Sequence, residues 1–329
     1  MTSKQAVALI LVFLSCAALV CAQTTRPTSP HDKTKFVLII TGAGGEAAYT
    51  KQFEQWTAEL HQALNSRFGF ASDNFTLLSE SGPKKSTADE VKSTFATLQT
   101  KLQPESVLFV FLIGHGSFDG REAKFNLVGR DLSAVDYSNM LASLPTKRVV
   151  ILNMSSASGE FIKNLSAKGR IVITATKSGQ EQNATRFPGF FITALTATDS
   201  DADQDGHISV LETFAYATRL TNEFYVRAGR LATEHALLED TGDGVGREKA
   251  ENGEGLLART TYLDSLNYEQ AAANAATAKM LRDRKRLEYE IETLIGNKSR
   301  MKEAEYFVEL EKLFIELAKV NRSIKLAGS

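Results

Sequence analysis

The chain has 329 residues, with 38 lysines and arginines against 39 aspartates and glutamates, so its formal net charge at pH 7 is −1. This balance excludes the strongly basic class of nucleic-acid-binding proteins, which depend on an excess of positive charge. The length is sufficient for one large domain or two modest domains with a substantial hydrophobic core.

The first 22 residues have the pattern of a signal peptide. Lys4 supplies a positive charge, the apolar run 6–20 follows, and Val20–Ala22 fits a small-residue cleavage site before Gln23. The apolar run is short for a membrane-spanning helix. The sequence therefore predicts an exported protein, periplasmic or secreted. The alternative is an uncleaved N-terminal segment that anchors the chain.

Both cysteines, Cys16 and Cys21, lie within the predicted signal peptide. A mature chain without this segment has no thiol, and therefore no disulfide, no thiolate nucleophile and no cysteine-ligated zinc. The polar stretch 23–34 contains two prolines and is predicted to be a flexible spacer.

From residue 35 to about residue 198, short apolar runs alternate with segments of helical periodicity. Strands are predicted at 35–42, 74–80, 106–114, 148–154 and 169–177. Helices are predicted at 49–68, 87–102, 133–144 and 187–197. The alternation indicates an α/β fold, a three-layer sandwich with a mainly parallel central sheet. In such sheets, functional residues collect in the loops at the carboxyl ends of the strands.

Two successive strand ends carry the candidate catalytic residues. His115 follows the long central strand between Gly114 and Gly116, where a sharp backbone turn suits a general base. The alternative for His115 is a structural role at a tight turn. The next strand ends in the hydroxyl-rich stretch NMSSASG, residues 153–159. A histidine beside such a cluster is the arrangement that nucleophile–base catalysis requires.

These stretches, in this order, resemble the caspase–legumain group of cysteine peptidases. Legumain-like members have a strand ending in His-Gly, here GHG, and a strand ending in an acidic residue, a small residue, the cysteine, any residue and Ser-Gly. With Ser158–Gly159 as the reference, the nucleophile position is Ser156 and the acidic position is Met154. The similarity covers about residues 36–246 and implies a caspase-like domain over 35–264.

The two departures from the family pattern bear on activity. A thiol ionises readily beside a histidine, whereas a serine hydroxyl needs an aligned base that is oriented by a buried carboxylate. The catalytic pair that the resemblance implies has no such acid. The leading hypothesis is therefore an inactive pseudo-peptidase with a peptide-binding or scaffolding role. The alternatives are an active endopeptidase that uses Ser156 as nucleophile and His115 as base, and an envelope protein that calcium merely stabilises.

The stretch DADQDGHISVLE, residues 201–212, fits the 12-residue template of an EF-hand calcium loop, with Gly206 at the turn. The predicted ligands at template positions 1, 3, 5, 7, 9 and 12 are Asp201, Asp203, Asp205, the backbone carbonyl of His207, Ser209 and Glu212. EF-hand loops usually occur in pairs, and no second complete loop occurs in the sequence. We expect a structural calcium site of modest affinity. The alternative is an acidic turn that caps the next helix. His235, in ATEHALLED, is predicted to lie on a helix in a structural role.

Residues 265–329 are predicted to form a helical hairpin or coiled coil, because they are rich in alanine, glutamate, lysine and arginine and are interrupted at Gly296–Asn297. Apolar residues in the second half follow the alternating spacing of four and three that is typical of a heptad seam: Tyr306, Leu310, Leu313, Leu317, Val320 and Ile324. These helices either pack on each other and on their own domain, or mediate self-association or binding of a partner protein.

Overall fold

The computed structural model of the chain describes residues 33–203, 207–250, 254–263 and 275–328. The predicted signal peptide, nearly all of the spacer, Asp205, Gly206 and the first ten residues of the predicted hairpin lie outside the described residues. Within the described residues, no helix is long and apolar enough to cross a membrane.

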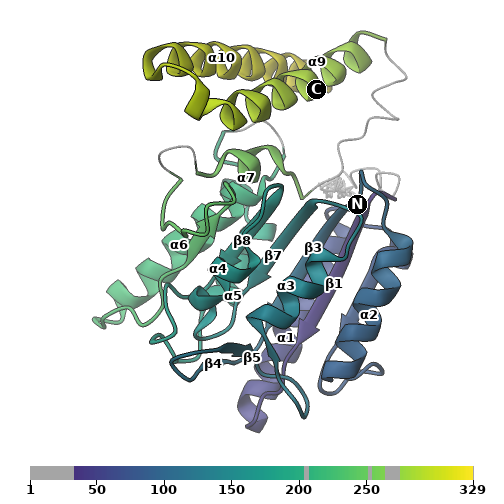
Figure 1. Cartoon of the computed structure of the whole chain (residues 1–329), viewed down its shortest axis with the longest axis vertical. Helices are drawn as coiled ribbons and strands as arrows, with labels where there is room; N and C mark the ends of the chain where they lie inside the picture. Colours follow the sequence, from purple (N-terminus) through teal and green to yellow (C-terminus); the bar gives the residue numbers. More distant parts are fainter. Residues whose placement is uncertain (1–32, 204–206, 251–253, 264–274, 329) are drawn as a thin grey trace, which may run out of the picture.

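The main body is a six-stranded sheet with the strand order β2–β1–β3–β7–β8–β9, and only β9 runs antiparallel to its neighbour (Figure 1). Its strands are β1 (Lys35–Thr41), β2 (Phe75–Leu78), β3 (Val107–Ile113), β7 (Arg148–Asn153), β8 (Arg170–Thr174) and β9 (Leu237–Glu239). Every strand predicted from the sequence is present, and the predicted α/β fold with a mainly parallel sheet is confirmed. The three-residue strand β9 was not predicted.

A second, smaller sheet follows His115 directly. It has the strand order β4–β5–β6 and consists of β4 (Gly116–Phe118), β5 (Ala123–Phe125) and β6 (Leu132–Ser133). Its strands are antiparallel and too short for a clear alternation of apolar and polar residues. This sheet is not predicted from the sequence.

Helices cover both faces of the main sheet (Figure 1). One face packs against α1 (Ala47–Ser66), α5 (Phe187–Thr196), α6 (Val210–Arg227) and the short α7 (Leu256–Thr260). The other face packs against α2 (Ala88–Lys101), α3 (Ala134–Ala142) and α4 (Ile162–Leu165). Because both faces are covered, successive residues of β1 point into opposite cores and all of them are apolar from Phe36 to Ile40.

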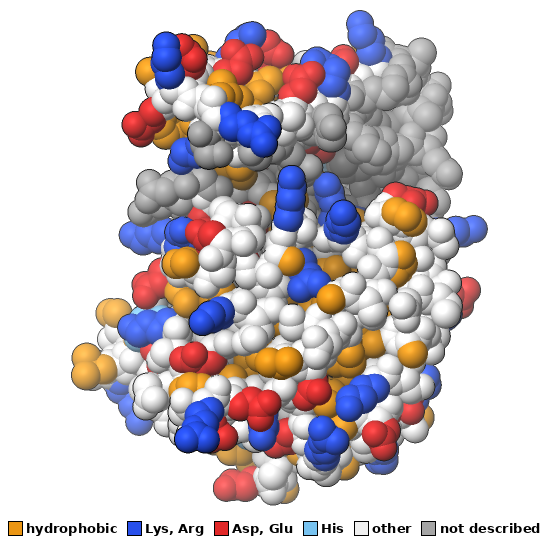
Figure 2. All heavy atoms as spheres, in the orientation of Figure 1, with side chains coloured by type: hydrophobic (Ala, Val, Ile, Leu, Met, Phe, Trp, Pro, Cys, Tyr) orange, Lys and Arg blue, Asp and Glu red, His pale blue; other side chains and the backbone are white. Residues whose placement is uncertain are grey.

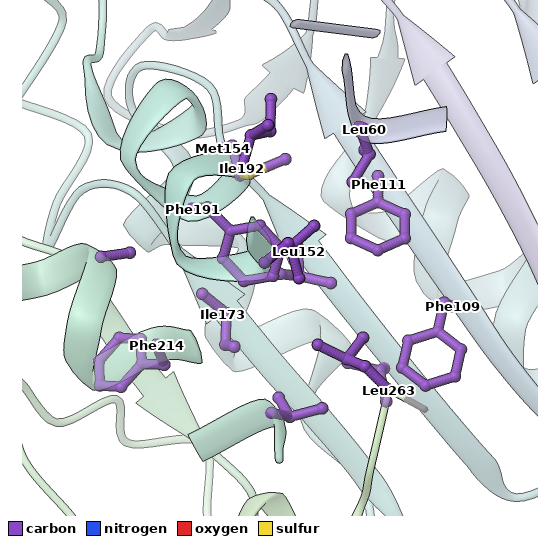
Figure 3. Packing of buried hydrophobic residues seen from close by; sticks show 14 of the residues in the cluster. Leu60, Phe109, Phe111, Leu152, Met154, Ile173, Phe191, Ile192, Phe214 and Leu263 are labelled. Atoms are coloured by element: carbon purple, nitrogen blue, oxygen red, sulfur yellow. The ribbon is translucent and has the colours of Figure 1, made fainter. Parts of the chain in front are cut away.

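Figure 3 shows the core on the face covered by α1, α5 and α6. Phe109 and Phe111 of β3 and Leu152 of β7 pack there with Phe191 of α5. Met154, which follows β7, is fully buried in the same cluster. Met154 is therefore a core side chain, and an ionised carboxylate at this position would be costly to bury.

The C-terminal region contains the two predicted helices, α9 (Ala275–Gly296) and α10 (Glu303–Gly328), which pack on each other (Figure 1). Their buried seam consists of Leu287, Ile291, Leu313 and Leu317, with Leu310 and Val320 partly buried against it. Four of the six predicted heptad positions, Leu310, Leu313, Leu317 and Val320, thus face the neighbouring helix of the same chain.

Candidate functional site

The structure places His115 and Ser156 at neighbouring strand ends, because β3 and β7 pair in parallel. The serine hydroxyl, however, is bound to backbone atoms. It donates a hydrogen bond to the carbonyl oxygen of Gly116 at 2.9 Å and accepts one from the N–H of Gly116 at 3.0 Å. Among the described residues, no hydrogen bond joins Ser156 to the imidazole of His115. The two predicted catalytic residues therefore share one edge of the sheet without forming a nucleophile–base pair.

The contact between the two strand ends is tight. A Cβ atom on Gly116 would lie 2.3 Å from the backbone oxygen of Ser156 and 2.7 Å from the Ser155 hydroxyl, so only glycine fits. Ser156 is itself only 2% exposed. The two turns are in this way locked together by hydrogen bonds and by close backbone approach.

The hydroxyl groups on either side of Ser156 also serve the turn itself. Ser155 donates to the side-chain oxygen of Asn153 at 2.7 Å, and Ser158 accepts from the N–H groups of Ala175 and Thr176, each at 3.1 Å. Ala157, between them, has a left-handed backbone with φ of 54°, which is uncommon for a residue other than glycine. All three serines are buried. The stretch therefore presents backbone-supporting hydroxyls, with none directed into solvent.

His115 is half-buried against helix α1. Its ring makes edge contacts with Tyr49 and Phe53, at centroid distances of 4.7 and 5.0 Å. Burial lowers the pKa of His115, and a hydrogen bond to the backbone of Gly44 and the charge of Glu46 partly oppose this shift. The imidazole is thus favoured in its neutral form, which suits either a base or a structural ring.

Asp119, the carboxylate nearest to His115 in the sequence, does not orient the imidazole. It lies in the exposed turn between β4 and β5, where it accepts hydrogen bonds from the N–H groups of Arg121 and Glu122. These bonds lower the pKa of Asp119. The described residues thus contain no carboxylate hydrogen-bonded to the His115 ring.

The loop after β8 is held at the same edge by two carboxylates, Glu234 and Glu181, for which the sequence predicts no role. Glu234 is buried and accepts hydrogen bonds from the N–H groups of Arg186 and Phe187, at the start of α5, and from the Tyr225 hydroxyl. Burial raises the pKa of Glu234, and these donors oppose the shift. The Nδ1 atom of His235 lies 2.5 Å from a carboxylate oxygen of Glu181.

His235 precedes β9 in an irregular segment, so its predicted position on a helix is wrong. Residues 233–236 have no helical hydrogen bonds, because the chain here leaves α6 and enters the antiparallel edge strand. A run of alanine, leucine and glutamate favours a helix by local propensity, and the sheet overrides that preference.

Three of the predicted calcium ligands come together. Carboxylate oxygens of Asp201, Asp203 and Glu212 lie within 4.8 Å of one another and can hold a metal ion. Burial raises the pKa of Glu212, and hydrogen bonds from Ser209 oppose this shift. Asp205 lies outside the described residues, so its place in the predicted set stays a prediction.

Ser209 and Glu212 also cap helix α6. The Ser209 hydroxyl accepts from the Glu212 N–H at 3.2 Å, and Glu212 accepts from the Ser209 N–H at 2.9 Å, which is a capping box. The other carboxylate oxygen of Glu212 accepts from the N–H groups of Ala202 and Asp203. The sequence offers capping and metal ligation as alternatives; the structure shows that Glu212 caps the helix, and the same carboxylate belongs to the group that can hold a metal ion.

EF-hand loops usually pair with a second EF-hand loop, whereas the acidic loop pairs with residues 261–263. Ser209 and Tyr262 form an antiparallel bridge, with hydrogen bonds of 2.9 Å from Val210 N–H to Thr261 and from Leu263 N–H to Ile208. The sequence carries no signal for this pairing, because residues 261–263 do not resemble a calcium loop.

Tyr262 connects this loop to the C-terminal hairpin. Its ring lies 5.8 Å from the His207 ring and 4.2 Å from the guanidinium of Arg284 in α9, the latter within cation–π range. The backbone carbonyls of Tyr262 and Leu263 also accept hydrogen bonds from Lys35 at the start of β1, at 3.1 and 3.3 Å. The acidic loop, the first strand and the hairpin therefore meet at one short segment.

An open cavity of about 450 Å³ gives solvent access to the acidic loop. Asp203 and Glu212 line it together with Tyr216, Arg219 and Arg259. The Ser156 side chain, by contrast, is almost completely buried.

No family model and no curated protein matches this chain. Among solved structures, the chain is similar to a structural genomics target protein from Geobacter sulfurreducens, with a TM-score of 0.43 and 12% sequence identity over 63% of this chain and 92% of that chain. A likeness at this level carries no functional argument, and the α/β fold follows from the strand order of the main sheet.

Proposed function

We propose that this protein is an exported, non-catalytic member of the caspase–legumain-like proteins, in which the nucleophile position has a structural role. The observation that carries the proposal is the pair of hydrogen bonds between the Ser156 hydroxyl and the backbone of Gly116. A nucleophilic serine needs a base to accept its proton. Here the proton points to a carbonyl oxygen, and attack would require both bonds to break in a buried turn.

The role that fits an inactive peptidase-like body is peptide binding or scaffolding. Two features support it. The strand-end surface keeps a half-buried imidazole and the partly exposed ring of Tyr49, groups that can contact a peptide without cutting it. The hairpin of α9 and α10 adds a second large surface to the α/β body.

The test is an incubation of the chain from Gln23 onward with a mixed peptide library and calcium, beside Ser156→Ala and His115→Ala. We expect no cleavage by any of the three proteins, and saturable binding of some peptides that His115→Ala weakens. Cleavage by the unaltered chain that disappears in both variants would establish the serine endopeptidase instead. Cleavage that persists in both would assign the activity to another site.

For the acidic loop, we propose calcium as the metal. Three carboxylates in a short loop offer the hard oxygen ligands that Ca²⁺ prefers, and the 12-residue spacing is that of an EF-hand loop. Magnesium demands near-ideal octahedral geometry and retains water, which suits a loop with shared ligands less well. Calcium at 100 times its dissociation constant is expected to stabilise the fold by about 2.7 kcal/mol.

A melting curve with calcium and with a chelator tests this proposal. We expect the midpoint to fall with chelator in the unaltered protein and to be insensitive to calcium in Asp201→Ala. The matched control is Asp199→Ala, an exposed acidic residue that lines the same cavity outside the three-carboxylate group. A melting midpoint that changes neither with chelator nor in the Asp201→Ala variant would contradict calcium binding.

A further inference from the structure

The end of helix α6 carries the most exposed apolar side chains of the α/β body. Val226 is 78% exposed and Leu231 is 91% exposed. All residues from Val226 to Leu231 are solvent-exposed. In Figure 2, hydrophobic side chains project at the left edge of the molecule, where α6 ends in Figure 1. An isolated exposed leucine is ordinary, whereas two apolar side chains at the end of one projection form a defined feature, named here the α6 tip (residues 226–231).

The α6 tip is a preformed turn. The Gly229 N–H binds the Val226 carbonyl and the Arg230 N–H binds the Tyr225 carbonyl, each at 3.0 Å. Gly229 has φ of 60°, so these bonds complete a Schellman motif. The residue after this motif, Leu231, points away from the body. Because the turn is already ordered, contact with a ligand would cost little conformational entropy.

Charge around the α6 tip is positive. Arg227 and Arg230 lie within it, and residues 226–232 include no acidic residue. The half-buried Glu223 is shared by Arg219 at 2.8 Å and Arg227 at 2.7 Å. Glu248 lines the same cavity as Val226 and Arg227, and the neighbouring Lys249 offsets its charge. The surface at this end of α6 therefore combines projecting apolar side chains with an excess of positive charge, both on one short turn.

We propose that the α6 tip docks on an anionic lipid surface, with Val226 and Leu231 entering the headgroup region and Arg227 and Arg230 contacting lipid phosphates. Apolar side chains flanked by arginine suit the boundary between anionic headgroups and acyl chains. A protein partner fits less well, because a stable protein interface buries about 800 Å² on each side, and a two-residue projection offers far less. The inference is independent of both Ser156 and the calcium loop.

Vesicle co-sedimentation tests the proposal. The chain from Gln23 onward keeps every described residue and lacks the predicted signal peptide, whose apolar run would bind vesicles by itself. We expect binding to vesicles of phosphatidylcholine with 30% phosphatidylglycerol, and much weaker binding to pure phosphatidylcholine. The double variant Val226→Ser/Leu231→Ser should lower the partition coefficient at least ten-fold. Arg227→Gln and Arg230→Gln should each lower it roughly five-fold at low salt.

The matched control is Val308→Ser, because Val308 is a 66% exposed valine on α10, outside the α6 tip. It should leave vesicle binding unchanged. Insertion can also be read directly, since the chain from Gln23 has no cysteine. An environment-sensitive fluorophore on Leu231→Cys should shift to the blue with anionic vesicles, and the same label on Val308→Cys should not.

Three results would overturn the proposal. The first is no binding of the unaltered chain to anionic vesicles. The second is binding that the Val226→Ser/Leu231→Ser variant retains, which would place the lipid contact elsewhere. The third is concentration-dependent self-association, measured by sedimentation, that this variant abolishes while vesicles remain unbound; that result would make the α6 tip a protein contact. Unfolding midpoints in urea should be equal for all variants, because each changes an exposed side chain.

Discussion

Glu234 anchors the loop that follows β8, and its replacement by alanine is expected to destabilise the protein strongly. Only 1% of the residue is exposed, and its carboxylate accepts hydrogen bonds from Arg186, Phe187 and Tyr225. The variant loses the cap on the first turn of α5, about 1 kcal/mol, and leaves the buried N–H of Phe187 without an acceptor, about 1–3 kcal/mol. Tyr225 keeps its bond to Thr233. Together these losses amount to about 3 kcal/mol.

Urea unfolding of the chain from Gln23 onward, at fixed calcium, measures this loss, and the m-value should stay unchanged. The control is Glu223→Ala, which removes two exposed ion pairs on α6 and should change the free energy of unfolding by about 1 kcal/mol or less. The stabilisation by these hydrogen bonds is opposed by the free-energy penalty for burying a carboxylate, and the same burial raises the pKa of Glu234. If Glu234→Ala is no less stable than Glu223→Ala, the penalty for burying the carboxylate cancels its hydrogen bonds, and the predicted loss of stability is wrong.

Three further predictions concern the edges of the α/β body. Gly116→Ala should destabilise the protein by about 3 kcal/mol or prevent folding, because its Cβ would lie 2.3 Å from the Ser156 backbone oxygen. Burial raises the pKa of Glu254 to about 8 from its usual 4.5, against the opposing charge of Arg247, so the folded state keeps the proton to a higher pH than the unfolded state. The free energy of unfolding should then fall between about pH 5 and pH 8, and Glu254→Gln should remove most of this fall. Tyr262→Ala removes the ring beneath Arg284 and should speed proteolysis of α9.

Each of these predictions has a matched comparison. Gly120→Ala, in the exposed turn after β4, meets no neighbouring atoms within 4 Å, although its φ of 90° is strained for alanine; it should destabilise less than Gly116→Ala. For Glu254, an equal pH dependence in the glutamine variant would show that another group holds the proton. For Tyr262, the comparison is Tyr49→Ala. Tyr49 lies near the carboxyl ends of the strands, whereas Tyr262 lies beside the start of β1. Equal proteolysis of α9 in both variants would refute the role of the Tyr262 ring.

The main sheet could be predicted because its strands are long apolar runs between helical segments. β9 could not, since three residues carry no periodicity and its partner β8 lies more than sixty residues earlier. The acidic loop and the Ser156 turn differ in the same way, because only the acidic loop has a local sequence pattern. The acidic loop follows a local template, and three of its predicted ligands converge. The Ser156 hydroxyl forms hydrogen bonds with backbone atoms of Gly116. Every residue type has such backbone atoms, so no side-chain pattern in the sequence predicts these hydrogen bonds.

Lys35 has a consequence for how the body can be engineered. It opens β1, and its ammonium group binds the carbonyls of Tyr262 and Leu263, where the described part of the α/β body ends. The first strand and residues 262–263 therefore lie side by side. A unit with adjacent ends tolerates circular permutation and insertion into a loop of another protein. Residues 35–263 are accordingly expected to fold when grafted into a host loop by both ends, with the hairpin removed.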